Sequence, residues 1–199
     1  MTTINNVNNC NTVLKQPGSF AETGVLDQKV FEQSYKMNPA HALFNCPVTS
    51  IKTAHYLETG TLPELNLSFP HRPRPTITED LPKKEWAKPV FDGLAPNRGS
   101  VVLTCSRNSL EFVMRQLGPG THAVIGANGK NSPGGHIWNY AYDGRKFTIL
   151  DSYSKRHHKL GLENPNKFFA GYNEKSLEVI LFYSRTPEND STVSLLKKK

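Results

Sequence analysis

The residue types best suited to chemistry in this chain are an imidazole and a carboxylate at the two ends of a predicted β-hairpin. His136 precedes the dipeptide Asp143-Gly144, and Asp151 follows it. Asp-Gly between two β-prone runs indicates a two-residue type I′ turn, because such a turn needs positive φ at both central residues. This turn pairs His136 directly with Asp151, with Cβ atoms roughly 4.5–5.5 Å apart. We therefore expect the carboxylate to accept a hydrogen bond from the histidine ring.

An imidazole held by a carboxylate can act as a general base. The carboxylate fixes the tautomer of the ring and raises its basicity, which leaves the other ring nitrogen free to take a proton from a nucleophile. Gly134 and Gly135 remove side chains from the approach to His136 and let another backbone come close. A purely structural His–Asp pair at the end of a strand is the alternative interpretation.

Cys46 is the best candidate for the nucleophile. It stands at the start of a helix predicted over 45–60, where free N–H groups and the positive end of the helix dipole stabilise a thiolate. Cys10 lies in an Asn-rich stretch, and Cys105 ends an apolar run, as a small buried hydrophobic residue does. The alternative for Cys46 is an inert thiol packed inside the protein.

The elements that must position these residues follow from the apolar periodicity. Helical spacing predicts helices over 25–37, 45–60 and 106–118, with Gly60 ending the second. Asn108 and Glu111 resemble a capping box for the third helix. Strands are predicted over 121–128 and 176–185, in addition to the hairpin, and the apolar run 100–105 suits either a strand or the approach to the following helix. A helical first half followed by a strand-rich second half indicates the α+β class, with the helices packed on an antiparallel sheet.

The remaining segments are predicted to lie outside regular structure. Residues 1–20 lack an apolar period and are expected to form a disordered leader before a single catalytic domain at 21–186. Residues 61–97 are rich in proline and indicate a long, rigid connection across the surface. Residues 187–199 are expected to form a polar, basic tail.

Composition narrows the classes of function. The chain has 24 basic and 17 acidic residues and a formal charge of +7. We assign this excess to a solvated surface and expect no nucleic-acid partner, because no nucleic-acid-binding motif accompanies it. The three cysteines form no CxxC pair, which argues against a disulfide framework or a metal site, and no cofactor is expected. We expect no membrane span and no secretory signal, since neither pattern is present.

Three short motifs together resemble a known family. Asn45-Cys46 at a helix start, Gly135-His136 with Asn139 three residues later, and Asp151 in the next strand are similar to the papain-like fold toxins and effectors of bacteria. These are cysteine hydrolases that include glutamine-deamidating effectors. The resemblance covers residues 43–60 and 106–153. The chain departs from the family pattern at two positions. Many relatives have a small residue or a cysteine where this chain has Thr49, and a glutamine where it has Tyr153.

The resemblance implies a papain-like fold and a role for each residue of the motifs. Cys46 would attack a carbonyl carbon as a thiolate, and His136 would take its proton and later protonate the leaving amine. Asp151 would orient His136. The backbone N–H of Cys46 would stabilise the oxyanion, with Asn45 as a weaker candidate donor. Asn139 lies on the opposite strand face from His136, so a hydrogen bond to backbone is an equal alternative to a supporting role in catalysis.

By analogy with that family, we favour a glutamine or asparagine deamidase that acts on a protein target. Proteolysis and transglutamination use the same acyl chemistry and remain alternatives, and a non-catalytic protein-binding module is a further one. The family also implies a protein substrate in a host or competitor cell, an immunity protein or chaperone as partner, and export from the bacterial cytoplasm without a signal peptide.

Overall fold

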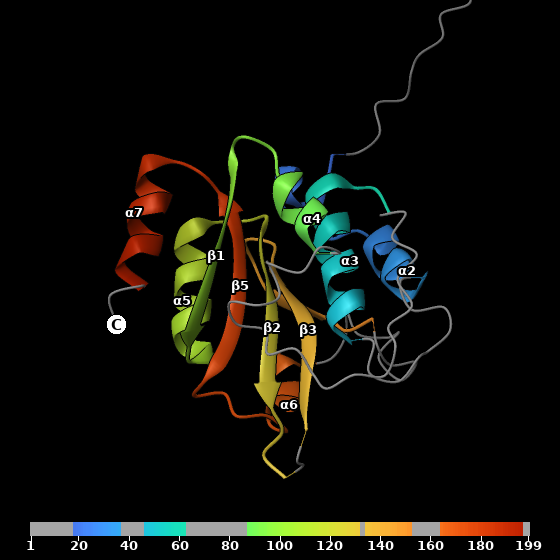
Figure 1. Ribbon diagram of the computed structural model, residues 1–199, viewed down its shortest axis with the longest axis vertical. Coiled ribbons are helices and arrows are strands. Elements are labelled where there is room, and N and C mark those ends of the chain that lie inside the picture. Colours follow the sequence, from blue (N-terminus) through green and yellow to red (C-terminus); the bar gives the residue numbers. More distant parts are fainter. Residues whose placement is uncertain (1–17, 37–45, 63–86, 132–133, 153–163, 197–199) are drawn as a thin grey trace, which may run out of the picture.

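The computed structural model describes residues 18–36, 46–62, 87–131, 134–152 and 164–196. Five antiparallel strands in these ranges form a sheet with the order β1-β5-β2-β3-β4 (Figure 1). The strands are β1 (Arg98–Cys105), β2 (Thr121–Asn128), β3 (Gly135–Tyr142), β4 (Phe147–Leu150) and β5 (Leu177–Ser184). The helices are α1 (Phe20–Thr23), α2 (Gln28–Lys36), α3 (Cys46–Thr59), α4 (Lys88–Asp92), α5 (Arg107–Leu117), α6 (Pro165–Phe169) and α7 (Pro187–Leu196).

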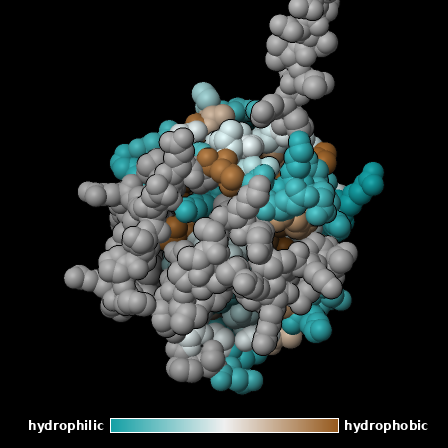
Figure 2. All heavy atoms as spheres, turned by 90° about the vertical axis from the view of Figure 1, so that its right-hand side faces the viewer, coloured by the Kyte–Doolittle hydropathy of each residue, from teal (hydrophilic) through white to brown (hydrophobic). Residues whose placement is uncertain are grey.

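Helices cover both faces of the sheet, so the central strands β2 and β5 are buried on both sides (Figure 1). Along β3, Ile137 faces a cluster that includes Ile51 of α3, whereas Trp138 faces a cluster formed with α5, α6 and α7. Helices α1–α4 come from the first half of the chain, and the strands come from the second half. This arrangement confirms the α+β class. On the side that carries α2 and α3, hydrophilic side chains form much of the described surface (Figure 2).

The helix that carries the candidate nucleophile has nearly its predicted bounds. Helix α3 begins at Cys46 and ends at Thr59. Gly60 follows with φ at 71°, and its N–H donates to the carbonyl oxygen of Tyr56 over 2.8 Å. A glycine in the left-handed region closes a helix at no steric cost, so the local sequence is sufficient to stop α3 here.

The register of the hairpin differs from the prediction. Tyr142 pairs with Phe147, so the connection is the four-residue segment 143–146 instead of the two residues Asp143-Gly144. The Asp143 carboxylate accepts hydrogen bonds from the backbone N–H groups of Arg145 and Lys146, both at 2.8 Å. An aspartate whose carboxylate accepts hydrogen bonds from the backbone N–H groups of the residues that follow it favours this wider turn over a type I′ turn.

Several predicted boundaries also need correction. Ser19 and Phe20 are buried and belong to the folded domain, although the leader was expected to extend to residue 20. The proline-rich connection contains helix α4, and the expected tail forms helix α7, which buries Val193. Helix α2 begins only at Gln28. Residues 1–17, 63–86 and 197–199 lie outside the described residues.

The predicted capping box of α5 is also wrong. The cap is Ser106, whose hydroxyl accepts from the N–H of Ser109. Glu111 instead accepts hydrogen bonds from Arg107 and from the hydroxyl of Tyr140, both at 2.7 Å. The contact with Tyr140 links α5 to the sheet. The Glu111 carboxylate therefore binds side chains instead of the backbone N–H group that a capping box would use.

Candidate active site

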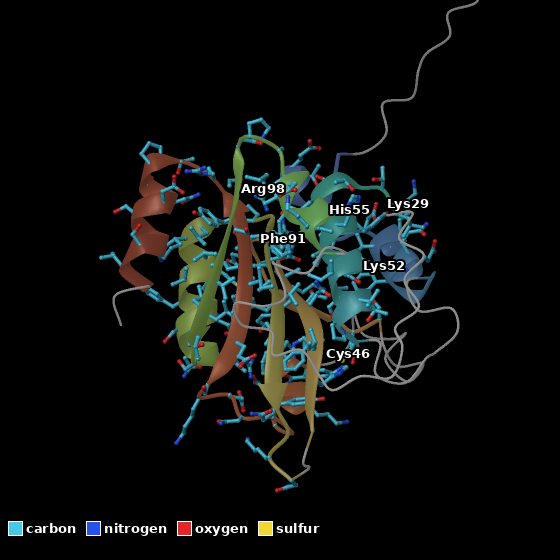
Figure 3. All side chains as sticks on the ribbon, viewed as in Figure 1. Lys29, Cys46, Lys52, His55, Phe91 and Arg98 are labelled. Atoms are coloured by element: carbon cyan, nitrogen blue, oxygen red, sulfur yellow. The ribbon has the colours of Figure 1, made fainter. Side chains whose placement is uncertain are left out.

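Cys46 lies at the first position of α3, at the end of the helix that packs beside β3 (Figure 3). Pro47 follows it, and proline suits the first helical turn because its missing N–H has no partner there in any helix. The other N–H groups of the first turn have no partner within the helix, so the positive end of the helix dipole faces Cys46. The sequence predicted this placement. Asn45, the other predicted oxyanion donor, lies outside the described residues.

His136 and Asp151 are in contact despite the altered register of the hairpin. The Nε2 atom of His136 lies 2.8 Å from the Oδ2 atom of Asp151. With Tyr142 opposite Phe147, Asp151 follows the last residue of β4 at the level of Trp138, one diagonal step from His136. A shift of two residues keeps every side chain on its original face, because the period of a strand is two. The predicted pair therefore forms, but diagonally.

Cys46 reaches His136 across the edge of β3. Strand β4 pairs with β3 only from Asn139 to Tyr142, so within the described residues it leaves the first half of β3 uncovered on that side. Helix α3 packs on one face of β3, and the His136 ring lies with Trp138 on the other. The Cys46 side chain lies close enough to the His136 ring to raise its pKa by hydrogen bonding and by charge. Because Nε2 faces Asp151, Nδ1 is the ring nitrogen that remains for the thiol.

The site favours a positively charged histidine. Burial of the His136 ring opposes the charge, but hydrogen bonds and charges from Asp151 and Cys46 outweigh it and raise the pKa of His136 to about 9. The side chain of His136 is 14% exposed and that of Asp151 is 2% exposed. Charges separated from water interact strongly. The arrangement can therefore hold an imidazolium next to the Cys46 side chain.

Aromatic rings enclose the histidine on the face away from α3. The Tyr172 ring lies 6.2 Å from the His136 ring, and the Trp138 ring lies 5.8 Å from it, both in stacked orientation. Burial, followed by the negative charges of Asp151 and Cys46, raises the pKa of Tyr172 to about 12. Tyr172 therefore stays a neutral phenol at physiological pH and forms an apolar wall beside the His136–Asp151 pair.

Asn139 has a structural partner. Its Nδ2 atom donates to the backbone carbonyl oxygen of Ser50 over 3.0 Å, and the Ser50 hydroxyl donates to the carbonyl oxygen of Ile137 over 3.1 Å. Asn139 thus points away from His136 and joins β3 to α3. The structure matches the alternative in which Asn139 binds backbone, here the backbone of a helix.

The other predicted features fall outside this cluster. Burial raises the pKa of the Cys105 thiol to about 11, as suits a cysteine that packs against the core. Cys10 lies outside the described residues. In the part of the chain that the structure describes, three or more His, Cys, Asp or Glu side chains nowhere gather closely enough to bind a metal ion. Within the same residues, no helix combines the length and apolar character needed to cross a membrane.

Sequence reasoning missed Tyr172 and the hydroxyl groups that anchor the site. Tyr172 follows helix α6 and reaches the site through a backbone bridge with Gly129, and no local motif marks it. The hydroxyls of Ser50 and Thr53 carry a weak signal, because polar residues occupy positions of α3 that are buried. Ser152 lies next to Asp151 in the sequence, and its hydroxyl contacts Thr53 at 2.9 Å.

Comparison of the chain with protein-family models, with curated proteins and with solved structures found no match.

Proposed function

We propose that the protein is a cysteine-dependent hydrolase of amide bonds with Cys46, His136 and Asp151 as its catalytic triad, and that it is a deamidase of glutamine or asparagine side chains in a protein target. The observation that carries this proposal is the contact of the His136 ring with both Asp151 and Cys46 at the start of a helix. The papain-like architecture is part of the same proposal. A helix that begins at a cysteine and packs on an antiparallel sheet supports it.

The first half of the proposed reaction forms a thioester. The Cys46 thiolate attacks the amide carbon, a C–S bond forms, and negative charge moves to the carbonyl oxygen. The first N–H groups of α3 follow Cys46 in the sequence and are the candidate donors of hydrogen bonds to this oxygen. His136, held in its protonated form by Asp151, gives its proton to the nitrogen. The C–N bond then breaks and releases ammonia.

The second half restores the enzyme. Neutral His136 takes a proton from water, and the resulting hydroxide attacks the thioester carbon. The C–S bond breaks, the thiolate returns to Cys46, and the product is a carboxylate. Asp151 stabilises the imidazolium in both halves and keeps the hydrogen of Nε2 directed toward itself, so that Nδ1 faces the sulfur.

Alkylation by iodoacetamide at pH 6 tests the proposed nucleophile. A free thiol with a pKa of about 8.5 reacts slowly at this pH, whereas a thiolate paired with an imidazolium reacts rapidly. We expect rapid modification of Cys46, much slower modification of Cys105, and loss of the rapid reaction in His136→Ala. The matched control is His55→Ala, which removes a half-buried histidine from the same helix that carries Cys46. Equal, slow labelling of all cysteines in the wild type would reject the hydrolase.

Intact-mass analysis of proteins exposed to the enzyme tests the type of reaction. Deamidation replaces NH₂ by OH and adds about one dalton, proteolysis gives fragments, and transglutamination adds the mass of an amine. We expect the gain of about one dalton with the wild type and with Cys105→Ala, and none with Cys46→Ala. Fragments would show that the protein is a protease and not a deamidase. Unchanged masses together with an unreactive Cys46 would favour the non-catalytic protein-binding module.

A further inference from the structure

Helix α3 has a row of hydroxyl side chains on its buried side. Thr49, Ser50 and Thr53 are all nearly inaccessible to solvent, although residues at helical positions inside a core are usually apolar. The Thr53 hydroxyl donates to the carbonyl oxygen of Thr49, one turn earlier in the helix, over 2.8 Å. Such a bond satisfies the hydroxyl but slightly weakens a helix. The helical fold of α3 therefore gives no reason for Thr53 to be polar.

Two of these hydroxyls bind the chain immediately beside a residue of the site. The Ser50 hydroxyl donates to the carbonyl oxygen of Ile137, the residue after His136. The Thr53 and Ser152 hydroxyls are 2.9 Å apart, and Ser152 is the residue after Asp151. A hydroxyl both donates and accepts, so this pair can form a hydrogen bond whichever of the two hydroxyls donates. The helix that carries Cys46 is thus joined to the neighbours of both other site residues.

These contacts set how far α3 can slide along the sheet. Ser50 and Thr53 lie about 6 and 10.5 Å along the axis from Cys46, at a rise of 1.5 Å per residue. Apolar packing alone tolerates small displacements of a helix, because the hydrophobic effect is not directional. Hydrogen bonds are directional and lengthen at once when the helix moves. Together with the bond from Asn139 to the Ser50 carbonyl oxygen, the two hydroxyl contacts therefore hold the sulfur in place relative to His136 and Asp151.

We propose that Ser50 and Thr53 are positioning residues of the active site, which hold α3 in the register that brings Cys46, His136 and Asp151 together. The inference rests on the proposed function. It differs from a role in stability, and the Thr53–Ser152 pair allows the two roles to be separated. Replacing both partners of a buried hydrogen bond by apolar groups of similar shape is nearly neutral for folding, whereas removing one partner costs stability. In a variant that lacks both hydroxyls of this pair, the reactivity of the site should therefore change far more than the stability of the fold.

The experiment compares Thr53→Val and Ser50→Ala with the wild type. The measurements are the alkylation rate of Cys46 at pH 6, the NMR titration of the His136 ring, and the midpoint of urea unfolding. We expect alkylation to slow by about 10- to 100-fold in each variant, the range that follows from displacing a reacting group by up to about 1 Å. In Thr53→Val we also expect a lower His136 pKa, because Asp151 is less well held. Cys46 also faces the ring and is displaced with α3, which lowers the pKa further, whereas Tyr172 is unchanged.

Two controls separate positioning from a general loss of structure. Thr53→Ser keeps the hydroxyl and should restore alkylation and titration to nearly wild-type values. Thr59→Val removes a hydroxyl from the exposed end of the same helix and should change neither. If Thr53→Val lowers the urea midpoint, the double variant Thr53→Val/Ser152→Ala removes both partners. The proposal requires that alkylation remains slow in this variant even when the midpoint recovers.

Wild-type rates and titration in both Thr53→Val and Ser50→Ala would overturn this inference and leave the hydrolase standing. Recovery of alkylation together with stability in the double variant would also overturn it. If wild-type alkylation does not depend on His136, the hydrolase itself fails. The His136 titration, compared between Cys46→Ala and Cys46→Ala/Thr53→Val, then still decides whether Thr53 holds Asp151 in place, because Cys46 is absent from both.

Discussion

Replacing Asp151 by asparagine in a Cys46→Ala background isolates the interaction between the carboxylate and His136. The pKa of His136 is about 9 in the intact site, against an ordinary value of 6.5, and this shift corresponds to about 3 kcal/mol in favour of the charged ring. Asp151 and Cys46 raise the pKa, and burial lowers it. With both side chains removed, burial is the remaining influence among the three. We therefore expect Cys46→Ala/Asp151→Asn to titrate below 6.5, and Cys46→Ala alone to titrate above it.

Ring ¹⁵N NMR titration, with the resonance assigned by its loss in His136→Ala, measures this difference directly. At pH 8 the pKa of about 9 in the intact site leaves roughly 90% of the rings protonated, and a pKa of 6.5 leaves roughly 3%, so Cys46→Ala should lie between these fractions and the double variant below roughly 3%. The two states are therefore easily distinguished at a single pH. A double variant that still titrates above about 7.5, or two variants with the same curve, would show that the carboxylate does not charge the ring and would refute the electrostatic account of the site.

The same shift has a consequence for stability, which urea unfolding measures in the two variants. Because the pKa of His136 is raised in the folded protein, the folded state keeps the proton above pH 6.5 while the unfolded state releases it. The contribution of Asp151 is therefore complete below pH 6.5 and is lost as the pH rises toward 9. In Cys46→Ala the free energy of unfolding should fall as the pH rises from 6.5 through the folded pKa of the ring, by less than the shift of about 3 kcal/mol in the intact site because Cys46 is absent, and Asp151→Asn should remove that fall.

Two further predictions concern the fold. Glu58 accepts hydrogen bonds from Arg98 and His122 inside the protein, and although burial opposes its charge, these partners lower its pKa to about 2. Its contribution to stability is present above pH 4.5 and is lost as the pH falls toward 2; Glu58→Gln should cost about 3–5 kcal/mol in urea unfolding at pH 7, and a loss under about 1 kcal/mol would contradict this. Gly118 and Gly120 both have φ above 80°, but an added Cβ at Gly120 would lie 2.7 Å from a carbonyl oxygen of α1, whereas one at Gly118 meets nothing within 4 Å. Gly120→Ala should therefore lower the melting temperature more than Gly118→Ala, by an additional free energy of about 1–3 kcal/mol, and equal effects would argue against this close approach.

The hairpin shows how a local signal can fix one property and miss another. Asp143-Gly144 correctly places a turn between two strands, because glycine accepts the positive φ that the turn requires. The length of the turn depends on whether the Asp143 carboxylate binds the backbone ahead of it, which a dipeptide pattern does not specify. The predicted contact between His136 and Asp151 survives because a shift of two residues leaves both on one face.

Helices α7 and α5 also show features that local composition and spacing do not predict. A polar composition predicted a tail at 187–199, but ten of these residues form α7, since burial of Val193 in the core supports a helix with few other apolar residues. Glu111 suits a capping box by spacing alone. It is instead held by Arg107 and Tyr140, and neither partner can be chosen without knowledge of the packing.

The sequence by itself determined the α+β class, the bounds of α3 and β2, and the faces on which His136 and Asp151 lie. These properties depend on neighbours within a few residues: a proline and a glycine at the ends of a helix, and the alternation of side chains along a strand. Only the tertiary structure decided that α3 packs on a face of β3, that hydroxyl contacts from Ser50 and Thr53 hold it there, and that the Tyr172 ring lies on the other side, next to His136. Those contacts join residues far apart in the chain, and their geometry follows from the packing of the whole core, to which every element contributes.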